Sequence, residues 1–187
     1  LANIYDIHGF CYYHYWFKNK KVMYEPLELM LIDGKPDKPF MFCWANEQWT
    51  RKWDGGNNEV LIEQDYSDVN GNKAHFQYLL QFFQHKNYII INNKPVFIFY
   101  RIEKKDKKYI EEIIQQWNYL AIQHNFAGIY FMRFLGPFDN DVHIEGIQGH
   151  INFEPGYVTQ KHGYEFNSYN KNHLLFDKHH YNETDYL

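Results

Sequence analysis

Phe40-Met41-Phe42-Cys43-Trp44-Ala45 is the stretch of sequence that decides the fold, and it follows directly after Pro39. All six residues are apolar, so the stretch lacks the apolar-polar alternation of a strand with one face in water. Continuous apolar strands are buried on both faces, which is typical of parallel sheets covered by helices. The stretch therefore predicts a buried strand of an α/β protein.

Strand-like and helical segments alternate on both sides of this stretch. Short apolar runs that predict further strands lie at residues 10–16, 96–100, 129–132 and 144–153. Apolar residues at helical spacing predict helices at residues 24–31, 76–83 and 110–121. This alternation indicates βαβ units around a parallel sheet, either doubly wound or closed into a barrel.

The barrel is the favoured form of this α/β fold. The sequence contains neither G-x-G-x-x-G nor G-x-x-x-x-G-K-[ST], the phosphate loops of nucleotide-binding open sheets. A complete (β/α)8 barrel of the TIM type takes about 250 residues. This chain has 187 residues, and it contains about five to six predicted strands. We therefore expect an incomplete barrel over residues 1–155, followed by a polar C-terminal segment over residues 156–187.

Charge and composition exclude several classes of partner and cofactor. The chain has 19 Lys and Arg against 23 Asp and Glu, so it lacks the positive excess that nucleic-acid binding needs. No window approaches the roughly 18 to 20 apolar residues of a membrane span. Cys11 and Cys43 each lie in an apolar run, which favours reduced core thiols and a cytoplasmic protein. His179-His180 fits no standard metal spacing, so we expect neither a metal nor another cofactor.

The predicted site lies at the carboxyl ends of the strands, where the active sites of parallel barrels are found. The segment at residues 44–55 places three tryptophans beside acidic, amide and guanidinium groups. This combination suits sugars, because flat indole rings cover the apolar faces of pyranose rings and the polar groups bind hydroxyls or phosphate. The predicted substrate-binding residues are His14, Trp16, Trp44, Asn46, Trp49, Arg51, Trp53, Asp54 and Arg101.

Glu47 is the first acidic residue after the central strand, so it is a candidate general acid, general base or electrostatic stabiliser. Glu154, near the last predicted strand, is the candidate for a second carboxylate. A structural interpretation stays open, in which the tryptophans plug the barrel mouth and Glu47 pairs with Arg51 four residues on. Arg133 follows the fourth strand and fits either a bidentate ligand contact or a structural ion pair.

Three segments closely resemble the WbsX-like family of glycosyltransferases of bacterial O-antigen and capsule clusters. They are residues 5–17, residues 39–55 with the motif Trp44-Ala45-Asn46-Glu47-Gln48-Trp49, and residues 93–97. The family is related to the endo-α-mannosidase group, glycoside hydrolase family 99. The resemblance implies a (β/α)8 barrel that acts on glycans, with the loop from Asn46 to Gly55 at the mouth. It also implies an earlier strand and a later Asn-Glu-Trp-x-Glu segment with catalytic glutamates, which this chain lacks.

The expected function is a glycosyltransferase of polysaccharide biosynthesis, with a glycan or an activated sugar as its partner. Two alternatives stay open. A glycoside hydrolase of the endo-α-mannosidase type needs two carboxyl groups about 5 to 5.5 Å apart for retention or about 6.5 to 9.5 Å apart for inversion. A partial barrel without those carboxylates is a non-catalytic glycan-binding module, and turnover distinguishes it from either enzyme.

Overall fold

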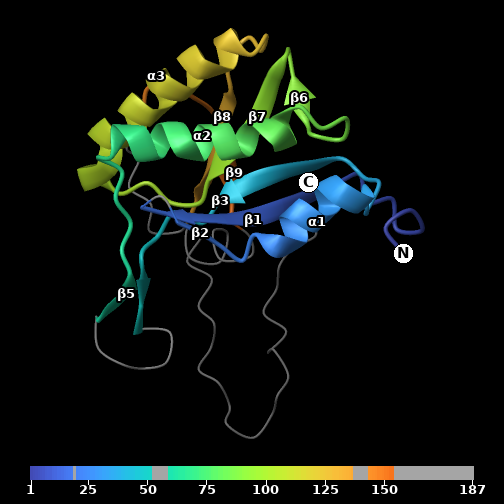
Figure 1. Ribbon diagram of the computed structural model, residues 1–187, viewed down its shortest axis with the longest axis horizontal. Helices are drawn as coiled ribbons and strands as arrows, with labels where there is room; N and C mark the ends of the chain where they lie inside the picture. Colours follow the sequence, from blue (N-terminus) through green and yellow to red (C-terminus); the bar gives the residue numbers. More distant parts are fainter. Residues whose placement is uncertain (19, 52–58, 137–142, 154–187) are drawn as a thin grey trace, which may run out of the picture.

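The computed structural model describes residues 1–153 except residue 19, residues 52–58 and residues 137–142. Its centre is a sheet in the order β2-β1-β3-β7-β8-β9, with β6 paired to β7 (Figure 1). The long strands run parallel to one another and comprise β1 (Phe10–Phe17), β3 (Phe40–Trp44), β7 (Lys94–Phe99), β8 (Tyr130–Leu135) and β9 (Ile147–Asn152). Short antiparallel strands are β2 (Lys20–Val22) and β6 (Ile90–Ile91), and β4 (Trp49–Thr50) pairs separately with β5 (Val60–Ile62).

Helices connect the first parallel strands in chain order. Helix α1 (Glu25–Asp33) lies between β1 and β3, α2 (Val69–Phe83) between β3 and β7, and α3 (Lys107–Gln123) between β7 and β8. A 3-10 turn, Lys104–Asp106, precedes α3. The prediction of an α/β fold with a mostly parallel sheet is confirmed, and every predicted strand and helix is present.

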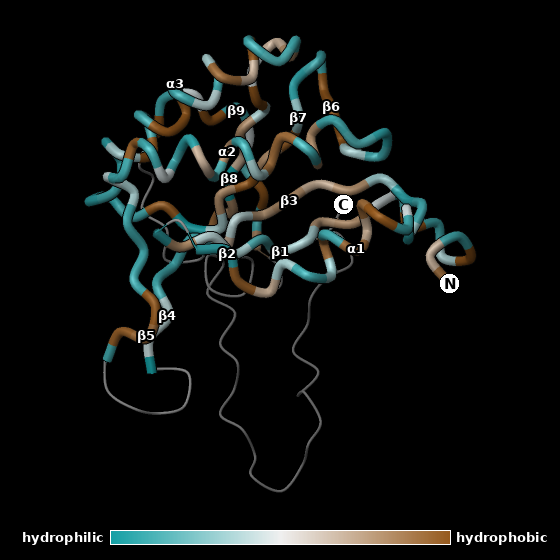
Figure 2. The backbone as a smooth tube through the Cα atoms, viewed as in Figure 1, coloured by the Kyte–Doolittle hydropathy of each residue, from teal (hydrophilic) through white to brown (hydrophobic). Residues whose placement is uncertain are grey.

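Local sequence signals set the helix ends. Pro26 occupies the first turn of α1, where no intrahelical N–H is lost, and Gly34 ends the helix in the left-handed region at φ +67°. Asp68 caps α2, since its side chain accepts a hydrogen bond from the backbone N–H of Gly71 at 3.0 Å. Figure 2 shows apolar and polar residues alternating along α2 and α3, as expected for helices with one buried face.

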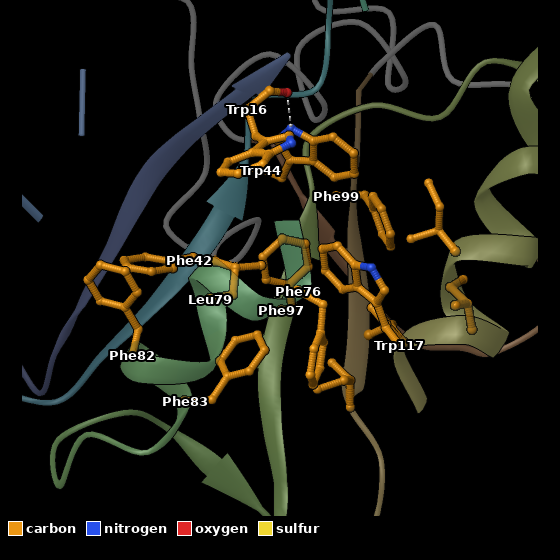
Figure 3. Packing of buried hydrophobic residues seen from close by; sticks show 14 of the residues in the cluster. Trp16, Phe42, Trp44, Phe76, Leu79, Phe82, Phe83, Phe97, Phe99 and Trp117 are labelled. Carbon is orange, nitrogen blue, oxygen red and sulfur yellow. Dashed lines mark hydrogen bonds between the residues drawn. The ribbon is translucent and has the colours of Figure 1, made fainter. Parts of the chain in front are cut away.

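One face of the sheet packs against the helices in a single apolar core (Figure 3). Phe42 of β3 meets Phe82 of α2 at a ring-centroid distance of 4.9 Å. Phe97 of β7 meets Trp117 of α3 at 5.1 Å. Leu27 of α1 belongs to the same buried cluster, so all three helices lie on this face.

The opposite face of the sheet carries the alternate side chains of each strand. His14 contacts α2 through His75, so its neighbours Tyr13 and Tyr15 point away from the helices. Phe99 belongs to the core, and Tyr100 therefore points to the other side. No helix of the described part of the chain packs on this second face, which we call the helix-free face.

The structure differs from the sequence-based analysis in two places. The polar segment at residues 46–72 has no apolar pattern from which an element was predicted, but it contains the β4–β5 pair and the start of α2, because a short apolar run (Val60–Ile62) and the Asp68 cap are weak signals in a polar segment. Both cysteines are free, and Cys43 is buried as expected, but Cys11 is exposed on the helix-free face.

Candidate functional site

The carboxyl ends of the adjacent parallel strands β3 and β7 bring three of the predicted site residues together. Asn46 and Glu47 follow β3, and Arg101 follows β7. A guanidinium nitrogen of Arg101, Nη1, donates to Oε1 of Glu47 at 2.8 Å. These residues are 54 positions apart in sequence, and they meet because parallel neighbours end at the same edge of the sheet.

Asn46 holds the backbone of Arg101 in place. Its side-chain Nδ2 donates to the Arg101 carbonyl at 2.6 Å, and its Oδ1 accepts from the Arg101 N–H at 3.0 Å. Nδ2 also donates to the hydroxyl of Tyr66 at 2.9 Å, and that hydroxyl donates to the Asn46 carbonyl. Asn46 is 1 % exposed, so this buried amide acts as a rigid clamp between two strand ends.

The ion-pair partner of Glu47, which the sequence left open, is Arg101. Glu47 does not pair with Arg51, which instead makes an ion pair with Glu59 at 3.3 Å beside the β4–β5 sheet. The Glu47 and Arg101 side chains are 35 % and 49 % exposed, so solvent screens the pair and it adds at most about 1 kcal/mol to stability. Its effect is positional, because the guanidinium fixes one carboxylate oxygen. The other, Oε2, has no hydrogen bond within the described part of the chain.

Further acidic groups surround this clamp, and the sequence did not single them out. The pKa of the Tyr66 hydroxyl is raised by burial and by the nearby charges of Asp106, Glu103 and Glu47. Asp106 is partly buried, and burial raises the pKa of its carboxyl. A raised carboxyl pKa is a property of groups that donate protons. No sequence signal identifies Asp106, because its burial depends on where the 3-10 turn before α3 packs.

Three predicted site residues lie in the sheet–helix core instead of at an open surface. His14, Trp16 and Trp44 are all buried, and Trp44 Nε1 donates to the Trp16 carbonyl at 3.1 Å (Figure 3). Nε2 of His14 lies 2.6 Å from Nε2 of His75 on α2. Burial lowers the pKa of His14 to about 3, so its ring is neutral at neutral pH. Because these three side chains are buried in the core, their placement does not favour contact with a ligand.

Of the remaining aromatic and acidic candidates, the structure describes Trp49. Trp49 on β4 is partly exposed and packs against Tyr15 on the helix-free side of β1, at 5.6 Å between ring centroids. Trp53, Asp54 and Glu154 lie outside the described residues.

Arg133 near the end of β8 is 3 % exposed, and its Nε is buried with no hydrogen-bond partner among the described residues. It shares a face of β8 with Phe131, which packs against the core, so it does not join Glu47 and Arg101 at the open edge.

A metal centre or a hollow elsewhere in the part of the chain that the structure describes would be an alternative to this edge. Within the described ranges, no group of three or more His, Cys, Asp or Glu side chains is arranged to hold a metal ion. A shallow hollow beside Asp6, His8, Asp37 and Lys38 lies at the amino ends of β1 and β3. Active sites of parallel α/β proteins lie at the carboxyl ends, so the hollow is not the candidate site. The helices of the described part are also too short or too polar to cross a bilayer.

Comparison with known proteins identifies the family of this chain. The model of the family described as "Glycosyltransferase WbsX" matches residues 1–186. The chain belongs to the WbsX glycosyltransferase family. Its W-A-N-E motif supplies the Asn46 clamp and the Glu47 carboxylate at the end of β3.

Two relatives of this WbsX-family chain are the proteins named "Uncharacterized protein WxcX" from two strains of Xanthomonas campestris pv. campestris, B100 and ATCC 33913. Each is 34 % identical over 101 residues, which are 54 % of this chain and 14 % of the relative. This chain therefore matches about one seventh of their length. No solved structure matches the chain at a significant level.

Proposed function

We propose that this chain is part of a glycosyltransferase of polysaccharide biosynthesis, with its glycan site at the carboxyl ends of β3 and β7. One observation carries the proposal: in a WbsX-family chain, the first acidic residue after β3 is held by Arg101, whose backbone is clamped by Asn46. A carboxylate fixed at a strand end, with one oxygen bound and the other available, is suited to proton transfer.

In the proposed reaction Glu47 is the general base. Its Oε2 takes the proton from a hydroxyl of the acceptor glycan as that hydroxyl oxygen forms a bond to the anomeric carbon of the activated sugar. The bond from the anomeric carbon to the leaving group breaks, and the leaving group departs with the electron pair. Arg101 keeps the carboxylate oriented through its 2.8 Å contact with Oε1.

The surrounding architecture in this proposal is a (β/α)8 barrel to which residues 1–155 contribute, with residues 156–187 as a separate segment. The order of the parallel strands in the sheet follows their order in the chain, and the three helices lie on one face, which is the arrangement of consecutive barrel units. We place the protein in the cytoplasm because both of its cysteines are free thiols.

Sugar transfer from a panel of nucleotide-activated sugars to glycan acceptors tests the proposal. We expect Glu47→Gln to lower kcat by about 100-fold or more, since the amide cannot accept the proton. Glu63→Gln is the matched control, because Glu63 is also acidic but is 67 % exposed in a surface pair with Lys18. Equal transfer by wild type and Glu47→Gln would remove Glu47 from the mechanism.

Glycoside hydrolysis is the second candidate function, and the raised pKa of Asp106 close to Tyr66 supports it. A carboxyl group with a raised pKa is better able to donate a proton, and in this alternative Asp106 protonates the glycosidic oxygen while Glu47 acts on the other side of the bond. Release of free sugar that depends on both Glu47 and Asp106, with no transfer, would favour the hydrolase. Binding without turnover would favour a glycan-binding module.

A further inference from the structure

A continuous row of aromatic rings crosses the helix-free face at the carboxyl side of the sheet. We call it the aromatic platform, and its members are Tyr13, Tyr15, Trp49, Tyr100, Phe134 and Phe153. They come from β1, β4, the residue after β7, β8 and the residue after β9. The six residues span 140 positions of sequence, so the row exists only in the folded chain.

The rings meet mostly edge to face. Tyr13 and Tyr100 lie 5.8 Å apart at 75°, although β3 separates their strands in the sheet. They can touch because the residue of β3 opposite Tyr13 is Cys43, which has a small side chain. Tyr100 and Phe153 lie 5.7 Å apart at 89°, and Phe134 and Phe153 lie 5.5 Å apart at 85°. Edge-to-face contacts hold the rings in fixed orientations and leave part of the ring surface uncovered.

The platform is open to solvent to a degree that is unusual for large aromatic residues. Tyr13 is 44 % exposed and Phe153 is 38 % exposed, and the other four members are partly exposed. In contrast, the aromatic residues of the same strands that face the helices, such as Phe42, Phe97 and Phe131, are fully buried. Contiguous exposed apolar surface of this kind marks a binding surface.

We propose that the aromatic platform is the surface on which this protein stacks a pyranose ring of its glycan substrate. The inference rests on the proposed function for the Glu47–Arg101 edge and names the part of the site that holds the sugar. Tyr100 is the residue directly before Arg101, so the platform and the polar edge are continuous. Apolar rings bordered by a few polar groups are the composition of sites that bind small ring-shaped ligands.

The chemistry of the platform favours a sugar over a charged ligand. Its six side chains carry no formal charge at neutral pH, and burial together with nearby Tyr100 and Cys43 raises the pKa of Tyr13 to about 12. The tyrosine hydroxyl groups can therefore donate and accept hydrogen bonds as sugar hydroxyls require. The axial C–H groups of a pyranose need an uncharged flat surface, which the ring faces provide.

The test is saturation-transfer NMR on the full chain with methyl pyranosides of glucose, galactose, mannose, rhamnose and glucosamine as probes. We expect saturation of the protein's aromatic protons to be transferred to the ring C–H protons of at least one pyranoside. Tyr100→Ala and Phe153→Ala should each weaken that binding by about tenfold. Tyr100→Phe keeps the ring and should bind within about twofold of wild type. Tyr119→Ala, an exposed ring on α3 outside the platform, is the control and should leave binding unchanged.

Sugar binding by the platform and sugar transfer by Glu47 can fail independently of each other. Sugar transfer that depends on Glu47, with no effect of Tyr100→Ala or Phe153→Ala on KM or on pyranoside binding, would overturn the platform and keep the transferase. Pyranoside binding that depends on the platform, with no transfer, would keep the platform and overturn the transferase. Unchanged sugar binding in platform variants that lose self-association would assign the platform to a second copy of the chain. Circular dichroism verifies that each variant folds, and Phe153→Ala is at an exposed strand end where truncation disturbs the core least.

Discussion

The buried His14–His75 pair should make the stability of this protein depend on pH. The pair joins β1 to α2, with 2.6 Å between the two Nε2 atoms, and both side chains are almost fully buried. The ring of Trp16 stacks on His75 at 4.7 Å and the ring of Phe42 stacks on His14 at 5.7 Å. One neutral imidazole donates the shared hydrogen bond and the other accepts it, so a second proton has no partner in this core.

The size of the effect follows from the pKa of His14. Burial lowers it from 6.5 to about 3, so in acid the unfolded chain binds a proton that the folded chain does not. The stability due to this group is complete above pH 6.5 and is lost as the pH falls from 6.5 towards 3. For a group with this pKa shift, the free energy of unfolding of the protein falls by about 2 kcal/mol by about pH 5. Burial and His14 lower the pKa of His75 too, so His75 adds to the loss in the same direction.

Urea unfolding followed by tryptophan fluorescence from about pH 7.5 to about pH 5 measures this loss. The double variant His14→Phe/His75→Phe removes both titrating rings and should flatten the pH dependence. Phe82→Leu changes a core residue of the same helix without removing a proton site, so it should lower stability equally at every pH. Tyr78, the other titratable ring against His14, has a pKa raised by burial and stays neutral over this range. An unfolding free energy of wild type that stays constant to pH 5, or a double variant that keeps the wild-type slope, would refute the reasoning.

Two further predictions concern single positions. Asn46→Ala removes three side-chain hydrogen bonds at a buried site, two of them to the backbone of Arg101, so urea unfolding should show a loss of about 2 kcal/mol in the free energy of unfolding. Thermal melting should show different effects of substituting two glycines with positive φ. Gly146→Ala should lower Tm more than Gly34→Ala. A Cβ at Gly146 would lie 2.5 Å from Cγ2 of Ile114, whereas nothing lies within 4 Å of one at Gly34. Equal losses of Tm would contradict the expected overlap with Ile114.

The sequence by itself determined the main parallel strands, the three helices and the sheet edge to which the proposed site is assigned. Continuous apolar runs predict the parallel strands, and apolar residues at helical spacing predict the helices, because burial requires these patterns locally. Glu47 and Asn46 could be selected from sequence because the active edge of a parallel sheet follows the carboxyl ends of its strands.

Only the tertiary structure decided which groups meet. Arg101 replaces Arg51 as the partner of Glu47 because β7 lies beside β3, a pairing 54 positions apart that no local pattern encodes. Trp44 was predicted to bind substrate, yet it packs into the core, since the face that each strand turns to the helices depends on how the chain crosses over. The aromatic platform likewise required the order of the strands in space, because its rings come from five separate segments that only the folded sheet brings into contact.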